Sequence, residues 1–425
     1  MNEQLSPPMI EIPARDKAAI RRLMIFFALV YIVEGAGQIV GLLAQPLSYF
    51  LKEVHGWTAL QVTAYITIFN FPWIIKPVYG AFSDFVPIFG YRRKPYLLAA
   101  NIAAAAGFVW AAQLNAPDRL VWALQLTAYG MAISSTVCGA VLVENGQRLQ
   151  ESGHFVNQQW LWFNAATVVA SVLGGELVQW LPPTTALHTA ALLVAFAPAA
   201  VLFGTIVLVP EQKTNVDLAG LKATFRGVIE TFRRRGLWLI AFFLFLYYFS
   251  PGLGTPLYYY MTDGLKFSQG FIGILGSIGA VGWVVGALLY RRLSDDWPSR
   301  HLLYLSIVLG TVTTAAYVFL YDETSAAILS FCSGFAAMAA TVATVTLAAD
   351  FCPPRSEGFT FGVMMSVINL ATSAANNVGS YLYDDVFHKN LTPLILVSAG
   401  FTAFAFVLVP LLRLGNKRQG QPVRV

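Results

Sequence analysis

A succession of long apolar segments, separated by short polar connections, most constrains what this chain can fold into. A helix needs about 20 apolar residues to cross the hydrocarbon core of a bilayer. Twelve segments meet this requirement, at roughly residues 22–50, 58–83, 95–115, 119–144, 158–181, 186–209, 237–261, 269–292, 301–321, 324–349, 357–384 and 391–412. Charged residues make up only 12% of the chain, against about a quarter of a soluble domain. Because a backbone in lipid must satisfy its own hydrogen bonds, we predict an all-α membrane protein with twelve transmembrane helices.

Basic residues are distributed unevenly among the polar connections. If the N-terminus is cytoplasmic, clusters such as 92–94 and 233–235 also fall on the cytoplasmic side, and the other side receives few Lys or Arg. The positive-inside rule therefore predicts a multi-pass protein with both termini in the cytoplasm. We expect a bacterial inner membrane or its organellar equivalent. The same bias accounts for the formal net charge of +5, so we expect no nucleic-acid partner.

The longest polar connection, 210–236, divides the apolar segments into six and six. Its apolar residues recur at helical spacing, which fits either a helix on the membrane surface or a solvated linker. At one common offset, Gly80 and Glu144 of the first half correspond to Gly286 and Asp350 of the second. Two six-helix halves of like topology indicate the major facilitator architecture, in which rocking of the halves gives alternating access. The predicted regions are a cytoplasmic arm 1–21, a six-helix half 22–209, the linker 210–236, a six-helix half 237–413 and a cytoplasmic tail 414–425.

The first apolar segment of each half contains residues that interrupt a helix at membrane depth. In the first segment Glu34 is followed by Gly35 and Gly37, and the seventh segment contains Pro251 and Gly254. Interrupted helices at corresponding positions of two halves indicate a solute site near the bilayer midplane. We predict that these glycine and proline residues are hinges between inward- and outward-open states.

Two charged residues lie within the apolar segments of the first half. Glu34 is about twelve residues from Arg22, hence near mid-membrane at 1.5 Å per residue. Charges at this depth are expensive and usually functional, so we predict that Glu34 couples transport to protons or pairs with a solute cation. The alternative is a structural ion pair or a carboxyl held by amides. Lys76, before Pro77, is predicted to bind a solute anion or pair with Glu34, unless its long stem reaches the interface.

The connection between the second and third segments contains the sharpest local motif. Asp84 ends the second segment, and a turn containing Pro and Gly leads to a basic triplet that includes Arg92 and Arg93. An aspartate at a helix end can hold a neighbouring helix by a charge-assisted bond to arginine, so we predict a latch at the cytoplasmic gate. The alternative is that the triplet only sets topology. Glu144 and Asp350 are predicted to be further gate residues or simply solvated helix ends. Their predicted partners are Arg148, Arg291, Arg292 and Arg355.

Two longer segments resemble the folate–biopterin transporter family, a branch of the major facilitator superfamily. Residues 71–96 contain Phe-Pro-Trp-Ile-Ile-Lys-Pro-Val-Tyr-Gly, then Ser-Asp and Pro-Ile-Phe-Gly-Tyr-Arg-Arg, and residues 352–369 contain Cys-Pro-Pro-Arg-Ser-Glu-Gly, then Met-Ser and Asn. The Tyr31–Gly35 stretch is also similar, although family members often have an uncharged amide at the position of Glu34. The resemblance covers both halves and implies a transporter of pteridines, folates or related solutes.

A pteridine-like ring would need aromatic surfaces for stacking and amides for hydrogen bonding. Amides in mid-helix are costly in lipid, so they should face the interior of the bundle. The predicted solute-binding residues are Gln38, Asn70, Trp73, Gln159, Trp162, Asn164, Tyr247, Tyr248, Asn369 and Asn376.

Other function classes fit the sequence less well. The histidines are scattered over predicted loops and span ends, which argues against a catalytic centre, and we predict no metal site, cofactor or nucleotide-binding motif. The partners expected of a monomeric transporter are a small organic solute, protons and the lipid bilayer. Two alternatives stay open, namely the same fold carrying a siderophore, peptide or muropeptide in either direction, and a membrane assembly factor without transport activity. The five histidines are His55, His154, His188, His301 and His388.

Overall fold

The structure, a computed structural model of the chain, describes residues 17–38, 41–149, 151–211, 213, 233, 235–350 and 357–412. Most of the predicted N-terminal arm, linker and tail lies outside the described residues, and so does the surface helix considered for the linker. The first half consists of α1 (Lys17–Gly37), α2 (Ala44–His55), α3 (Ala59–Ile68), α4 (Phe71–Ile74), α5 (Lys76–Phe85), α6 (Lys94–Ala111), α7 (Pro117–Leu149), α8 (Ser152–Trp180) and α9 (Pro183–Leu208). The second half consists of α11 (Arg235–Tyr248), α12 (Gly254–Tyr259), η1 (Tyr260–Gly264), α13 (Gln269–Asp296), α14 (Ser299–Ala316), η2 (Tyr317–Phe319), α15 (Glu323–Asp350), α16 (Glu357–Tyr381), η3 (Leu382–Val386), α17 (Leu391–Leu408) and η4 (Val409–Leu412).

The order of these helices is consistent with the predicted twelve crossings. Within the described part of the chain, seven helices are long and apolar enough to cross a membrane, namely α7, α8, α9, α13, α14, α15 and α17. The other crossings follow in chain order as α1–α2, α3–α5, α6, α11–α12 and α16. Three of these are divided into shorter helices.

The first and seventh crossings are interrupted partway, in the segments where the sequence predicts helix-breaking residues. α1 ends at Gly37 and α2 begins at Ala44, so six residues separate them, and residues 249–253 separate α11 from α12. The second break is held from outside, because the Gly252 N–H donates to the Ala375 carbonyl of α16 at 2.9 Å. A backbone group freed by a broken helix is therefore satisfied by a neighbouring helix, as burial in a membrane requires.

The second crossing is also divided, which the sequence analysis did not predict. Proline stands in the first turn of both α4 and α5, as Pro72 and Pro77. Because proline has no N–H and its ring clashes with the preceding turn, it starts a helix more easily than it continues one. The breaks at Asn70 and Ile75 set the direction in which the side chains of α4 and α5 point.

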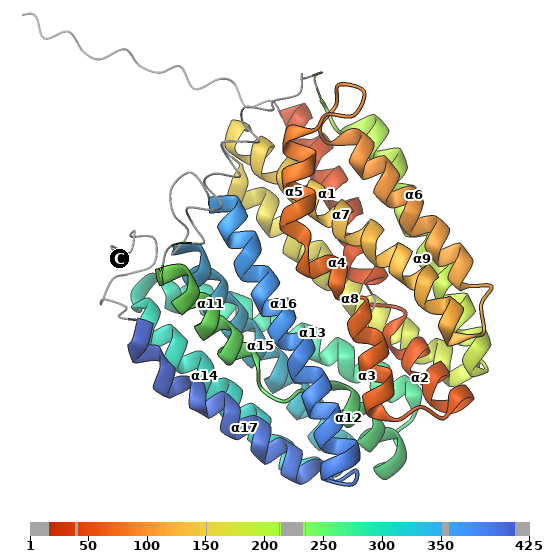
Figure 1. Cartoon of the computed structure of the whole chain (residues 1–425), viewed down its shortest axis with the longest axis vertical. Helices are drawn as coiled ribbons and strands as arrows, with labels where there is room; N and C mark the ends of the chain where they lie inside the picture. Colours follow the sequence, from red (N-terminus) through yellow and green to blue (C-terminus); the bar gives the residue numbers. More distant parts are fainter. Residues whose placement is uncertain are drawn as a thin grey trace, which may run out of the picture.

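The connections between crossings alternate between the two ends of the bundle (Figure 1). We call the end that carries the α2–α3 turn, at the lower right in Figure 1, the Lys52 end. We call the end that carries the connection from α5 to α6, at the top, the Arg93 end. The two halves meet along α8 against α13 and along α3–α5 against α16.

Buried apolar residues are arranged differently at the two ends. One cluster contains residues of both halves near the Lys52 end, for example Leu47 and Phe69 with Tyr259 and Leu391. Toward the Arg93 end the clusters are separate, one built only from the first half and one only from the second. The halves thus share a buried apolar cluster at the Lys52 end, whereas toward the Arg93 end no buried cluster of the described residues contains residues of both halves.

Candidate functional site

Glu34 and Lys76 are joined by a serine that the sequence analysis did not single out. The Lys76 ammonium donates to Ser135 Oγ at 3.1 Å, and the Ser135 hydroxyl donates to Glu34 Oε1 at 2.9 Å. Glu34 comes from α1, Lys76 from α5 and Ser135 from α7, so the cluster forms where three crossings of the first half meet. Sequence reasoning missed Ser135 because one serine in a long apolar helix is an unremarkable signal.

The two oxygens of Glu34 differ in their surroundings. Oε1 accepts from Ser135 and also from Gln38 Nε2, at 3.2 Å, whereas Oε2 is buried and has no hydrogen-bond partner. A buried carboxylate oxygen without a partner carries a desolvation cost. Oε2 is therefore the atom of this cluster best placed to receive a proton or a donor group of a solute. Gln38, a predicted solute-binding residue, here holds Glu34.

Lys76 lies at the start of α5 beside an aromatic ring. Its ammonium is 4.1 Å from the centroid of the Trp73 ring, a cation–π distance. The two residues are three positions apart, a spacing at which side chains on a helix are neighbours. Lys76 is thus directed into the bundle and held by Trp73 and Ser135.

Several predicted solute-binding amides connect the two halves. Asn70 Nδ2 donates to Ser373 Oγ at 3.1 Å, and Asn369 Nδ2 donates to the Trp73 carbonyl at 3.3 Å. The structure therefore places Asn70 and Asn369 beside the Trp73–Lys76 contact, each with a partner on the opposite half.

The same helices continue this pattern toward the Lys52 end. Asn377 Nδ2 donates to Thr67 Oγ1 at 2.7 Å, and the hydroxyls of Thr63 and Ser380 are 2.7 Å apart. We call these four contacts the polar seam. They recur at three- and four-residue spacing on α16, which places them on one face of that helix. The seam comprises Thr63, Thr67, Asn70 and the Trp73 carbonyl on one side, with Ser380, Asn377, Ser373 and Asn369 on the other.

Other predicted solute-binding residues lie on separate surfaces. On α8, Trp162 Nε1 donates to Gln158 at 2.8 Å, and Trp162 lines an apolar cavity of about 270 Å³ between α1 and α8. Asn164 Nδ2 donates to a carbonyl of its own helix, and Gln159 is half-buried on the same helix. The structure thus does not gather these three α8 residues with Glu34 through any hydrogen bond of the described residues.

The other predicted solute-binding residues of the second half, apart from Asn369, are held within that half. Tyr247 and Ser306 hydroxyls are 2.9 Å apart, and Tyr248 and Thr344 hydroxyls are 2.7 Å apart. Asn376 packs against the backbone at the break between α11 and α12. The second half therefore has hydroxyls and an amide near its own broken helix.

The predicted hinge residues differ in how closely they are packed. A Cβ on Gly35 would collide with the Phe163 carbonyl of α8, and a Cβ on Gly37 would be 3.2 Å from the Met131 methyl. Gly254 has open space around it, and the Pro251 carbonyl accepts from the Ser398 hydroxyl. Gly35 thus permits close packing of α1 on α8, while Gly254 alone of these glycines is free of contacts.

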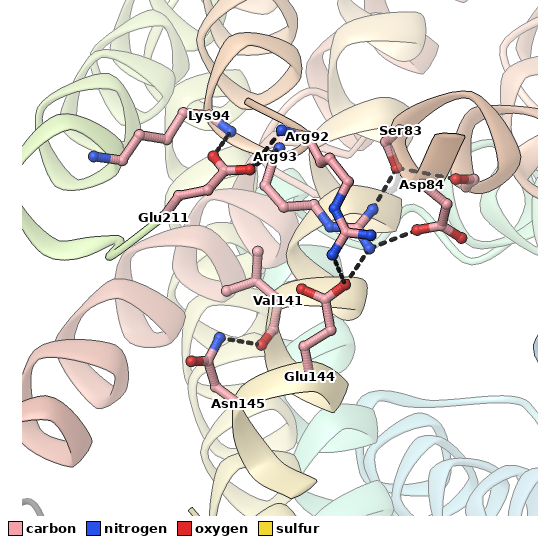
Figure 2. Close-up of polar contacts among 10 residues, drawn as sticks. Ser83, Asp84, Arg92, Arg93, Lys94, Val141, Glu144, Asn145 and Glu211 are labelled. Atoms are coloured by element: carbon pink, nitrogen blue, oxygen red, sulfur yellow. Dashed lines mark hydrogen bonds and ion pairs between the residues drawn. The ribbon is translucent and has the colours of Figure 1, made fainter. Parts of the chain in front are cut away.

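A second polar cluster surrounds Arg93 at the Arg93 end (Figure 2). Its guanidinium donates to Ser83 Oγ at 2.6 Å and to the carboxylates of Asp84 and Glu144, and the residue is 5% exposed. Burial by itself opposes the charge, but the bonds to Glu144 and Asp84 outweigh it and raise the pKa of Arg93. Arg92 is 3.7 Å from Glu144 and more exposed. The cluster joins α5, α6 and α7, all within the first half.

The partner of Glu144 differs from the predicted ones. Glu144 pairs with Arg93 and Arg92, and Arg148 instead donates to Asn145 Oδ1 at 2.8 Å. One helical turn separates Glu144 from Arg148, but the tertiary fold brings a better-placed arginine from α6. The side chains of Arg291, Arg292 and Asp350 and the whole of Arg355 lie outside the described residues.

Glu211, which the sequence analysis did not select, caps the start of α6. Its carboxylate accepts from the backbone N–H groups of Arg92, Arg93 and Lys94 at 2.6, 2.7 and 2.8 Å. Figure 2 shows this carboxylate directed at the start of the helix. A carboxylate at a helix N-terminus satisfies free donors and complements the helix dipole. The chain that follows α9 is thereby fastened to α6.

A third set of contacts joins the halves at the Lys52 end. The Lys52 ammonium donates to Asp263 Oδ1 at 2.6 Å, across the halves, and to Glu53 at 2.8 Å. Burial opposes the charge of Lys52, but the bonds to Asp263 and Glu53 outweigh it and raise the pKa of Lys52. Nearby, the Tyr259 hydroxyl donates to the Trp57 carbonyl. These contacts, together with the shared apolar cluster, close this end.

Comparison with known proteins identifies what kind of protein has this arrangement. The profile of the BT1 family matches residues 36–419. The chain belongs to the BT1 family. It is 27% identical over 412 residues to a folate-biopterin transporter of Synechocystis sp., covering 92% of this chain and 81% of that protein. It is 23% identical over 405 residues to folate transporter 2 of Plasmodium falciparum, covering 90% and 87%.

Solved structures of transporters share the fold. The nucleoside transporter NupG matches with a TM-score of 0.71 at 12% identity, covering 93% of this chain and 99% of that one. A D-xylose–proton symporter matches with a TM-score of 0.71 at 14% identity, covering 92% and 97%. This member of the BT1 family is thus an integral, multi-pass membrane transporter of the major facilitator type, and not an enzyme.

Proposed function

We propose that this protein is a secondary active transporter that moves a polar organic solute of pterin or folate type by alternating access, coupled to protons through Glu34. The names of its relatives support the solute class. The observation that carries the coupling is the Glu34–Ser135–Lys76 cluster, in which a buried carboxylate oxygen has no partner. A proton or a solute donor would supply the missing partner.

Charge balance gives the cluster a reason to bind a proton and an anionic solute together. Glu34 and Lys76 carry opposite charges, so the empty cluster is neutral when Glu34 is ionised. An anionic group bound at Lys76 would leave a buried net negative charge, which is unfavourable away from water. Protonation of Glu34 removes that charge, so solute and proton favour each other's binding. The proposal is therefore symport of one proton for each negative charge that Lys76 receives.

Because the Lys52 end is closed, solute would reach the Glu34–Ser135–Lys76 cluster from the Arg93 end in this conformation. Toward the Arg93 end no buried apolar cluster of the described residues joins the halves, so solute would enter or leave there. If the basic connections are cytoplasmic, as the positive-inside rule predicts, this conformation faces inward, with both termini in the cytoplasm of a bacterial cell. The predicted regions 22–209 and 237–413 would then be the rocking bodies.

The decisive experiment measures uptake of radiolabelled folic acid and biopterin into proteoliposomes, with and without a pH gradient. We expect the wild type to concentrate at least one of them only when a gradient is present. Glu34→Gln should retain solute exchange at equal pH on both sides but lose gradient-driven accumulation, because its amide takes up no proton. Full, pH-dependent accumulation by Glu34→Gln would disprove the coupling role. Uptake of a siderophore or peptide in place of both pterins would reassign the solute.

A further inference from the structure

Ser135 lies between Glu34 and Lys76, and the proposed coupling gives it no role of its own. We propose that Ser135 transmits the protonation of Glu34 to the solute, by releasing its hydroxyl hydrogen from Glu34 to an acceptor atom of the solute. This inference rests on the proposed function and adds a positioning residue to it. The solute group it implies is a carbonyl or carboxylate oxygen, which can accept from a hydroxyl and from an ammonium at once.

The chemistry of the three groups fixes the direction of each hydrogen bond. An ionised carboxylate only accepts, an ammonium only donates, and a serine hydroxyl has one hydrogen and two lone pairs. With Glu34 ionised, the Ser135 hydrogen therefore points to Oε1, and Ser135 Oγ accepts from Lys76, as the distances of 2.9 and 3.1 Å indicate. In this state neither the Ser135 hydrogen nor that proton of Lys76 is available to a solute.

Protonation of Glu34 weakens its hydrogen bond with Ser135, and no existing hydrogen bond has to break before the proton binds. The Glu34 Oε2 atom has no hydrogen-bond partner, so it can take a proton from entering water while Oε1 keeps both of its bonds. The Ser135 bond then changes from a charge-assisted one to a neutral one, which is roughly half as strong. The attraction between Glu34 and Lys76 disappears as well. Both donors become free to turn to a solute oxygen.

The surrounding helices supply few competing charges. Lys76 is the cation that faces Glu34, and Tyr31 and Cys138, which are 1% and 0% exposed, lie near Glu34. The titratable residues of the adjacent helices α8 and α9 lie near helix ends. They are His154, Glu176 and His188. The protonation of Glu34 thus acts on Ser135 and Lys76 before any other charged group of the described residues.

Three variants of α7 separate this role from mere packing. Ser135→Ala removes the hydroxyl, Ser135→Thr restores one, and Ser134→Ala removes the neighbouring buried hydroxyl, which accepts from Asn101 Nδ2 at 2.9 Å instead. Folic acid is the probe, and each variant is reconstituted in proteoliposomes. KM is measured by solute exchange with the same pH on both sides of the membrane, and the measurement is repeated at several pH values. Gradient-driven accumulation is measured in the same preparations.

Wild type should bind folic acid more tightly as pH falls. In Ser135→Ala this dependence should flatten, with KM at low pH raised roughly tenfold, the factor expected for one hydrogen bond to a charged group. Ser135→Thr should recover most of the dependence, and Ser134→Ala should behave as wild type. A wild-type pH profile in Ser135→Ala, or equal loss in Ser134→Ala, would overturn the role of Ser135. Absence of any pH dependence in the wild type would overturn the coupling proposal and this inference together.

Infrared spectroscopy of the Glu34 carboxyl group tests the contact between Ser135 and Glu34 without any solute. Infrared difference spectra on acidification should show the carboxyl band of Glu34, identified by its disappearance in Glu34→Gln. Loss of the Ser135 hydrogen bond should move that band to higher frequency in Ser135→Ala, and in Ser135→Cys if the alanine variant does not fold. An unmoved band would show that Ser135 does not act on Glu34. If the band moves but the protein does not bind folic acid, the Ser135–Glu34 contact would be supported and the proposed solute class would be rejected.

Discussion

At the scale of single residues, the two adjacent arginines at the start of α6 differ sharply in their surroundings. Arg93 is 5% exposed and bonded to Ser83, Asp84 and Glu144, whereas the Arg92 side chain is 39% exposed and 3.7 Å from Glu144. A buried guanidinium satisfies several planar acceptors at once, which an ammonium does not. Arg92 and Arg93 are the same residue type, but we therefore expect them to contribute differently to stability.

Arg93→Lys should destabilise the protein and Arg92→Lys should not. Lysine at 93 keeps the charge but reaches fewer of the three acceptors, so we expect the free energy of unfolding to fall by about 2 kcal/mol. This is less than the loss from breaking a fully buried pair, because both carboxylates are partly solvated. Thermal unfolding of the detergent-purified variants measures this as a Tm several degrees lower for Arg93→Lys. Equal melting temperatures for the two variants would contradict the assignment.

At the scale of elements, the broken helices depend on contacts with helices of the same and the opposite half. The break between α11 and α12 lies against α16, where Asn376 leaves no room for a Cβ on Gly252 and the Gly252 backbone leaves none for a Cβ on Gly379. The same helix α16 makes the polar seam with α3 and α4 on another part of its surface. Movement of α16 would therefore reach the α11–α12 break and the Trp73–Lys76 contact together.

Two glycines in this break offer a matched comparison. Gly252→Ala should lower Tm and abolish uptake, because a Cβ there collides with the side chain and backbone of Asn376. Gly254→Ala meets nothing within 4 Å, and it should be neutral or stabilising by about 0.5 kcal/mol through the unfolded chain. Tm and uptake are measured for both. Uptake lost in Gly254→Ala at unchanged Tm would support its predicted role as a hinge, and a stable, active Gly252→Ala would contradict the packing argument.

At the scale of the whole molecule, the closure of the Lys52 end combines a shared apolar cluster with the Lys52–Asp263 ion pair. The apolar contacts supply most of the stabilisation, since exposed ion pairs contribute about 0.2–1 kcal/mol. The pair is nevertheless specific to the closed state, because its partners come from opposite halves. A small change in its strength should therefore shift the balance between open and closed states.

Asp263→Asn should open the Lys52 end more often, and Glu53→Gln should not, because only Asp263 belongs to the other half. A cysteine introduced at Thr63, which is 4% exposed in the seam, reports opening through its labelling rate. We expect that rate to rise roughly two- to fivefold in Asp263→Asn, in keeping with the value of a surface pair. An equal rise in Glu53→Gln would show that the effect is not one of closure.

The pH dependence of this contact follows from Lys52. Because the folded-state pKa of Lys52 is raised, its stabilising contribution is complete below the unfolded value of about 10.4 and is lost as pH rises through the folded one. The contribution of Lys52 to closure should therefore be constant between neutral and mildly alkaline pH, and it should cause no change with pH in the labelling rate at Thr63→Cys. Lys52→Gln, which lacks the charge at every pH, is the control for buffer effects.

The sequence by itself determined the membrane crossings and their order, because length and hydropathy are local properties that lipid selects directly. It also indicated Glu34, Lys76 and the two interrupted crossings, since charges and helix breakers are conspicuous in apolar segments. It did not indicate Ser135, Glu211 or the Lys52–Asp263 pair, whose residue types are ordinary where they stand. Those partners depend on how each helix is rotated and how deeply it lies, which only the packing of all the helices decides. For the same physical reason the sequence did not indicate that the partners of Asn70 and Asn369 lie on the opposite half.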